Sequence, residues 1–291
     1  MYTKSLFLWC GVVLLGACSK PSPTKTISGK YELTGAVKTL EIKSYLPQND
    51  SLQTQMEKRK KSGTEQHCII HFSPSGNQTE VTLFDKRGKD KVHFKILYNK
   101  DQQISEKRLF DKTDSLEGRY VFKYDGKELL TKQFFEGEKD LYSNWDYTYD
   151  AQGRKIEIES YGPAGDLDYK RTFTYNKAGH IGTDKWYNGN AEDPQDVKKF
   201  TYDEQGRKTE EEYRNLSDHY TVKIKYSYND HDLLASKKVF DASGELQHEK
   251  TYNYNYDDTG NWVERIETEK GIPIFITERK ITYYKNAEQV D

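Results

Sequence analysis

Apolar and polar residues alternate along most of this chain. In the clearest stretch, Val222, Ile224, Tyr226 and Tyr228 fall on every second position, and the residues between them are lysine, lysine and serine. Successive side chains of a β-strand point to opposite faces, so this spacing predicts strands with one apolar face and one polar face. No stretch of the repeating pattern described next is long enough for a helix that would cross between parallel strands.

An aromatic residue opens a short polar turn nine times, and the copies lie about 26 residues apart. A second aromatic series lies between them and precedes an opposite set of turns. Each repeat therefore supplies two strands and two reversals, which predicts an antiparallel meander. The residues of the first series are Tyr31, Phe72, Tyr98, Tyr124, Tyr149, Tyr175, Tyr202, Tyr228 and Tyr256.

The turns share a chemistry that suits hairpin tips. An Asp can accept hydrogen bonds from the backbone of the turn, and a Gly four residues after the aromatic residue can adopt a positive φ. These residues have structural roles in our interpretation. The clearest copies predict such turn positions at Tyr149, Asp150, Gly153, Tyr175, Gly179, Tyr202, Asp203, Gly206, Tyr256, Asp257 and Gly260.

We predict an all-β fold in which about nine 26-residue hairpin repeats form a twisted, curled sheet that is open rather than a closed barrel. Closing so many strands would leave a wide interior that the short loops could not fill. The aromatic face should turn inward, and the Lys, Thr and Glu face should be solvated. An insertion at about residues 47–64 interrupts the first repeat.

The N-terminus has the features of a targeting segment. One basic residue, Lys4, precedes an apolar run that ends at Leu-Gly-Ala-Cys18, and the run is too short to span a bilayer as a helix. This ending resembles the lipobox of bacterial lipoproteins, which implies a signal peptide over 1–17 and a lipidated Cys18. Residues 18–29 then form a tether, and 30–291 form the repeat domain. An ordinary secretory signal remains the alternative.

The Tyr-Asp-x-x-Gly-Arg copies at 149 and 202, with variants at 175 and 256, resemble the YD repeats of the RHS family. Members of that family use such repeats as a continuous β-sheet around a toxin or as an extracellular adhesion surface. The sequence stops at Asp291 and leaves no room for a cargo domain. The resemblance therefore implies the sheet and not toxin delivery.

Charge and side-chain chemistry narrow the functional classes. The formal net charge is −2 with both signs interspersed, so nucleic-acid binding is not expected. His67 and His71 should lie on the face opposite Cys68, so no metal site is expected there. Loop 188–194 is acidic but lacks the ligand spacing of a calcium loop. No catalytic motif is visible, so we predict no enzyme and no cofactor, although separate strands could still assemble an acid and a base.

Three aromatic residues could form a stacking platform for a sugar or a peptide, namely Trp186, Tyr187 and Trp262; the alternative is that they belong to the core. The predicted function is a lipid-anchored binding or adhesion surface of the bacterial cell envelope, held at the outer membrane, with a glycan or a protein as ligand. Whether it faces the periplasm or the exterior is left open. A purely structural scaffold is the second hypothesis, and a carbohydrate-active enzyme is the third.

Overall fold

The computed structural model describes residues 31–47, 61–126, 129–137 and 141–285. All regular elements in these ranges are β-strands, so the all-β prediction is confirmed. None of the described residues forms a helix that could cross a bilayer. The strands are β1 (Val37–Pro47), β2 (Lys61–Phe72), β3 (Gln78–Phe84), β4 (Asp90–Tyr98), β5 (Ile104–Asp111), β6 (Leu116–Tyr124), β7 (Leu130–Gly137), β8 (Leu141–Tyr149), β9 (Lys155–Tyr161), β10 (Leu167–Tyr175), β11 (Ile181–Asn188), β12 (Asp196–Tyr202), β13 (Lys208–Asn215), β14 (Tyr220–Tyr228), β15 (Leu234–Phe240), β16 (Leu246–Tyr256), β17 (Trp262–Glu269) and β18 (Ile272–Tyr283).

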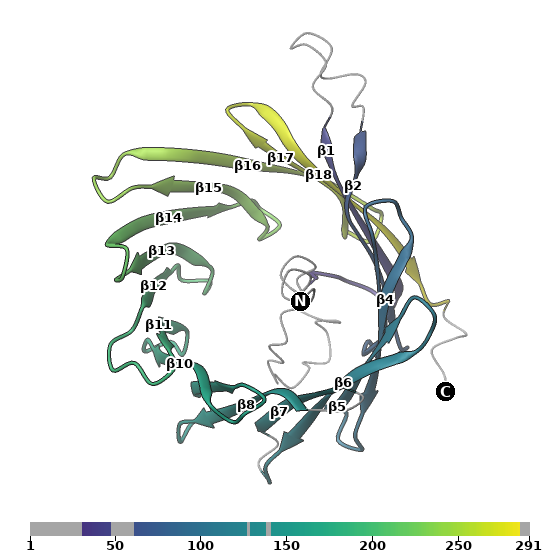
Figure 1. The fold of residues 1–291 in the computed structure, drawn as a ribbon. Coiled ribbons are helices and arrows are strands. Elements are labelled where there is room, and N and C mark those ends of the chain that lie inside the picture. Colours follow the sequence, from purple (N-terminus) through teal and green to yellow (C-terminus); the bar gives the residue numbers. More distant parts are fainter. Residues whose placement is uncertain (1–30, 48–60, 127–128, 138–140, 286–291) are drawn as a thin grey trace. The chain divides into compact units, whose positions relative to one another are not determined.

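The strand order corrects the prediction of an open sheet. The strands form one 18-stranded sheet in which β1 pairs with β2 on one side and with β18 on the other, as Figure 1 shows for these three strands. The first and last strands of the meander therefore pair with each other and leave no free edge, which contradicts the open sheet that we predicted. An unpaired edge would expose a row of backbone N–H and C=O groups, and pairing β1 with β18 satisfies them.

The described chain divides into two compact units. Unit 1 comprises residues up to 117 together with 253 onward, and unit 2 comprises 118–252. The buried residues of unit 1 include two aliphatic pairs: Leu40 and Ile70 are register partners across β1 and β2, and Ile276 pairs with Ile266 across β17 and β18. Leu40 and Ile276 have no exposed surface.

A short segment at the start of the described chain, Tyr31–Ala36, packs into unit 1. The Asn261 side chain accepts from the Thr34 backbone N–H at 2.6 Å and donates to the Thr34 carbonyl at 2.8 Å. Arg279 Nη1 donates to the Tyr31 carbonyl at 2.9 Å, and its guanidinium stacks on the Trp262 ring. Since Tyr31, Asn261 and Trp262 are all buried, this segment covers part of the unit 1 core.

Unit 2 has an aromatic face and a polar face. The aromatic face carries a buried cluster of Leu130, Tyr147, Ile158 and Phe173, with further aromatic side chains packed around it. The polar face is held by cross-strand pairs such as Thr174 with Thr183, whose hydroxyls lie 2.7 Å apart.

Each Tyr-Asp-x-x-Gly-Arg copy closes a hairpin through its Asp. Asp150 Oδ1 accepts from the backbone N–H groups of Gln152 and Arg154 at 3.0 and 2.9 Å, and the Asp150 N–H donates to the Arg154 carbonyl. Gly153 has a φ of 76°, a conformation that glycine adopts without steric cost. Asp203 and Asp257 each likewise accept a hydrogen bond from the backbone N–H of the residue four positions later in the chain.

The repeat tyrosines join each repeat to the one before it. Their hydroxyls donate to a backbone carbonyl 19 to 21 residues earlier: Tyr149 to Leu130, Tyr175 to Lys155, Tyr202 to Ile181 and Tyr228 to Lys208. The last residue of the motif reaches the next repeat, since the Arg154 and Arg207 guanidinium groups lie 4.6 and 4.9 Å from the ring centres of Tyr175 and Tyr228. The contacts between successive repeats therefore recur with the same period of about 26 residues as the sequence pattern.

Several sequence predictions lie outside the described residues. These are the signal peptide over 1–17, the lipidated Cys18, the tether over 18–29 and most of the insertion at 47–64. At the borders of that insertion, β1 extends to Pro47 and β2 begins at Lys61.

Candidate functional site

The aromatic face of unit 2 loses its apolar pattern in four neighbouring strands. In β8 the residues that precede the turn on this face are Trp145, Tyr147 and Tyr149. In β10 to β13 the corresponding face carries charged residues, because the strand registers align Arg171, Asp184, Lys198 and Glu211 with aromatic and aliphatic side chains. Asp196 lies on the same face at the start of β12. Charges on an apolar face are costly unless they are paired, so each of them needs a partner.

Strands β10 to β12 line an open groove of about 350 Å³. Two aromatic residues, two cations and two carboxylates line it: Tyr169, Trp186, Arg171, Lys198, Asp184 and Asp196. Register explains the grouping, because Arg171 is opposite Trp186 and Trp186 is opposite Asp196. The formal charge of the lining is therefore zero.

Arg171 and Asp184 bind each other across β10 and β11. The guanidinium donates from Nε to Asp184 Oδ1 at 3.2 Å and from Nη2 to Oδ2 at 2.5 Å. A two-pronged contact of this kind holds both side chains in one geometry. Asp184 is 9% exposed, and Arg171 covers it from the groove side, so this pair forms a fixed part of the groove wall.

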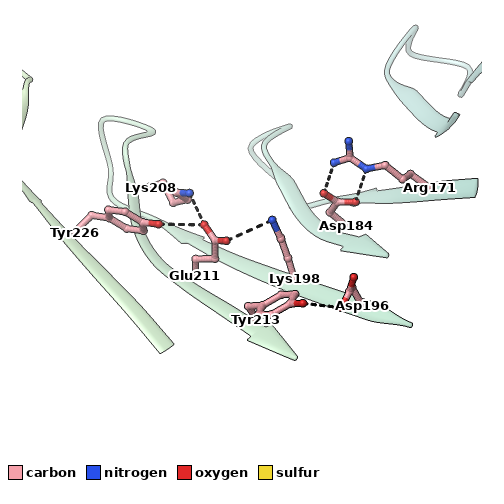
Figure 2. A network of polar contacts seen from close by, with 8 residues as sticks. All are labelled: Arg171, Asp184, Asp196, Lys198, Lys208, Glu211, Tyr213 and Tyr226. Atoms are coloured by element: carbon pink, nitrogen blue, oxygen red, sulfur yellow. Dashed lines mark hydrogen bonds and ion pairs between the residues drawn. The ribbon is translucent and has the colours of Figure 1, made fainter. Parts of the chain in front are cut away.

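Asp196 is positioned by two residues of the neighbouring strand. Its Oδ1 accepts from the Tyr213 hydroxyl at 2.7 Å, as Figure 2 shows. The same oxygen accepts from Asn215 Nδ2 at 3.0 Å. The hydrogen bond to Asp196 raises the pKa of the Tyr213 hydroxyl, with a smaller contribution from burial, and Tyr213 therefore stays a donor. Oδ2 of Asp196 has no hydrogen-bond partner among the described residues.

Lys198 extends toward a second polar cluster beside the groove. Glu211 accepts from Lys208 Nζ at 2.6 Å and from the Tyr226 hydroxyl at 3.1 Å, and its other oxygen is 3.9 Å from Lys198 Nζ (Figure 2). Burial would raise the pKa of Glu211, but Lys208, Lys198 and Tyr226 outweigh it and the pKa is lowered. Glu211 is therefore ionised at neutral pH, and it attracts Lys198 at a distance too long for a hydrogen bond.

Trp186 and Tyr169 form the aromatic wall. Their ring centres are 6.2 Å apart with a 32° tilt, and both side chains are partly exposed. The Tyr169 hydroxyl accepts from Trp145 Nε1 at 3.1 Å, which fixes the outer end of the ring. A fixed and partly exposed aromatic surface suits stacking of an apolar ligand face.

The structure does not bring the three predicted stacking residues together. Trp186 lies in the groove. Tyr187 lies on the polar face, where Lys170 Nζ is 5.0 Å from its ring centre. Trp262 belongs to unit 1, is 5% exposed and contacts Arg279 and Glu32, so it is part of the core there.

The predicted repeat-turn residues lie at hairpin tips and not in the groove. Gly179, Gly206 and Gly260 have φ values of 85°, 79° and 83°, as the turn chemistry requires. In unit 1, Cys68 is buried while His67 stacks on Phe84 and His71 is exposed. Among the described residues, no group of three or more His, Cys, Asp or Glu side chains could hold a metal ion.

Of the groove residues, the sequence had pointed only to Trp186. In β10, Arg171 shares one face with Tyr169, Phe173 and Tyr175, and this interruption of an aromatic row was the available signal. Which charges pair could not be read from spacing, since Arg171 and Asp184 belong to different strands.

Comparisons with known proteins leave the family undetermined. No protein family matches the chain, and no curated protein matches it. Among solved structures, a porin-like protein from Bacteroides uniformis aligns with 84% of this chain and 96% of its own at 10% identity and a TM-score of 0.43. A porin-like protein from Bacteroides vulgatus aligns with 86% and 99% at 10% identity and a TM-score of 0.39. The Tc holotoxin pore of Photorhabdus luminescens aligns with 73% of this chain at 10% identity and a TM-score of 0.25, and the match spans 19% of that chain.

Proposed function

We propose that this protein is a lipid-anchored binding protein of the bacterial cell envelope and that its ligand occupies the groove on the aromatic face of β10 to β12. One observation carries the proposal: the middle residues of this face in β10 to β12 are a paired and oriented set of polar side chains beside a partly exposed Trp186. Departures from a local folding rule are expected where function requires them.

The composition of the groove indicates the chemistry of its ligand. The aromatic wall suits a ligand with an apolar face, such as a sugar ring or a short peptide, and the polar floor offers donors and acceptors together. Net neutrality of the lining argues against a phosphate-rich ligand, because Asp184 and Asp196 would repel it. An extended peptide that adds a strand is also disfavoured, since β10 to β13 are each paired on both sides.

The anchoring part of the proposal depends on the N-terminal sequence. The lipobox-like Leu-Gly-Ala-Cys18 supports attachment at the outer membrane, and the YD-like repeats support an envelope or extracellular role. Acyl chains on Cys18 would hold the protein at the membrane through burial of methylene groups.

Ligand binding can be tested with a thermal-shift screen of sugars, peptides and small metabolites against the purified full-length protein. A compound that occupies the groove should raise the melting temperature of the wild type and have no effect on Trp186→Ala. The matched control is Thr174→Ala, which changes the polar face of the same unit and should leave the shift intact. If no compound depends on Trp186, the scaffold hypothesis replaces this proposal.

Anchoring can be tested separately by cell fractionation. Replacing Cys18 with Ser should move the protein from the membrane fraction to the soluble fraction. Tight membrane association of the Cys18→Ser protein would contradict lipid anchoring without affecting the groove.

A further inference from the structure

The groove leaves one acceptor open and one cation only weakly paired. Asp196 Oδ2 has no hydrogen-bond partner in the described part of the chain, while Oδ1 is held by Tyr213 and Asn215. The Lys198 side chain is 42% exposed, and its Nζ lies 3.9 Å from Glu211 Oε1 and 5.8 Å from the centre of the Tyr213 ring. The other two charged residues of the lining, Arg171 and Asp184, form a two-pronged ion pair with each other.

These two groups have a defined spacing along the strand. Asp196 and Lys198 are two residues apart on β12, so both point to the aromatic face and their Cα atoms lie about 7 Å apart. Their charges are opposite, and no ion pair joins them within the described structure. Trp186 is the register partner of Asp196, which places an aromatic ring beside the carboxylate.

We infer that the groove takes a short zwitterion, a molecule that carries an ammonium and a carboxylate group about as far apart as the two ends of a dipeptide. The ammonium binds Asp196 Oδ2 beside the Trp186 ring, where an aromatic face also attracts a cation. The carboxylate binds Lys198 Nζ, and Arg171 Nη1, which makes no hydrogen bond within the described structure, belongs to the same groove lining on β10, two strands away. This inference rests on the proposed function and specifies its ligand class.

Other ligand classes fit less well. A simple anion would bind Lys198 but would lie close to the carboxylate of Asp196, which would stay unpaired and repel it. A simple cation would bind Asp196 but would lie close to the ammonium group of Lys198, which would repel it. An uncharged polyol would satisfy hydrogen bonds without compensating either charge. A two-residue peptide spans about 7 Å and places both of its charges at the required separation.

Four probes separate these cases by isothermal titration calorimetry on the purified full-length protein. Glycylglycine carries both charges, N-acetylglycylglycine only the carboxylate, and glycylglycine amide only the ammonium; muramic acid presents both charges on a sugar. Glycylglycine should bind at least about tenfold more tightly than either singly charged form. The relative affinity of muramic acid distinguishes a sugar carrier from a peptide carrier of the same two charges.

Two variants assign the charges to residues. Asp196→Asn should reduce glycylglycine affinity to that of the N-acetyl form and leave the N-acetyl form unchanged. Lys198→Met should reduce glycylglycine affinity to that of the amide and leave the amide unchanged. A general loss of structure would weaken all probes together, so these opposite patterns distinguish recognition from stability.

Lys223→Met provides the matched control. Lys223 lies on the polar face of β14 with 43% of its side chain exposed and an ion pair to Glu210, so it resembles Lys198 in exposure but not in location. It should leave all four affinities unchanged. Equal affinities for the three dipeptide probes would overturn the zwitterion inference. The inference would also be overturned if the protein bound none of these probes but still bound another compound in a way that depends on Trp186. Absence of any Trp186-dependent ligand would instead overturn the proposed function.

Discussion

Unit 1 and unit 2 are built from the same repeat but use its aromatic face differently. In unit 1 that face buries aliphatic residues such as Leu40 and Ile70, and Tyr31–Ala36 packs against the unit. In unit 2 the face carries Arg171, Asp184 and Lys198 on β10 to β12 beside partly exposed aromatic rings. Among the largest described side chains with less than 2% exposure, only Gln133 belongs to unit 2.

The difference shows which positions of the repeat maintain the fold and which can vary. The turn Asp and the repeat tyrosine make the same bonds to the backbone in both units: Tyr98 donates to the Gln78 carbonyl in unit 1 as Tyr228 does to Lys208 in unit 2. The residues between the turns decide whether the face becomes a core or a groove. Function can therefore change at mid-strand positions while the period is kept.

The largest contrast is expected between a core residue of unit 1 and a groove residue of unit 2. Leu40→Ala should lower the free energy of unfolding by about 2–5 kcal/mol, because it leaves a cavity at a fully buried position. Lys198→Met should change it by less than about 1 kcal/mol, since Lys198 is well exposed and only weakly paired. Urea titration of both variants measures the two values. Similar costs would mean that the groove charges are structural.

A smaller contrast is expected between two turn glycines. Gly260 in unit 1 and Gly206 in unit 2 have φ values of 83° and 79°, so alanine at either position should cost about 1–2 kcal/mol. Alanine at 206 would also place its Cβ 2.9 Å from the His180 ring, which is stacked on Tyr202, whereas nothing lies within 4 Å at 260. Gly206→Ala should therefore be the more destabilising variant in thermal melts. Equal melting temperatures would show that the His180 ring moves away at no cost.

The smallest expected effect is a pH dependence that originates in unit 1. Burial lowers the pKa of His67 although Glu41 lies 2.9 Å from its Nε2, so the folded state disfavours the protonated ring. The unfolded chain binds more protons below its ordinary pKa of about 6.5, and stability should decrease as the pH falls from 7 toward 5. Urea titrations across this range should give a shallower decrease for His67→Gln than for the wild type. Parallel curves would contradict this assignment.

Sequence reasoning was most successful where interactions are local. The turn at Asp150 involves bonds within four residues, and the alternation from Val222 to Tyr228 follows from strand geometry alone. The prediction of an open sheet was wrong, because it treated a wide interior as a cost and did not count the backbone groups that β1 and β18 satisfy in each other. For Trp262 both a stacking role and a core position had been left open, and the core position is confirmed; spacing alone could not decide this, since the residues that contact it, Glu32 and Arg279, lie elsewhere in the chain.

By itself the sequence determined the all-β class, the 26-residue period and the chemistry of the turns, because these depend on side-chain alternation and on bonds between near neighbours. Only the tertiary structure decided that β1 pairs with β18 and that charged residues from three strands line one groove. Both depend on the register between strands: the β1–β18 pairing joins residues more than 200 positions apart, and the partnership of Arg171 with Asp184 exists only in one alignment of β10 and β11. A one-residue shift would move either side chain to the opposite face.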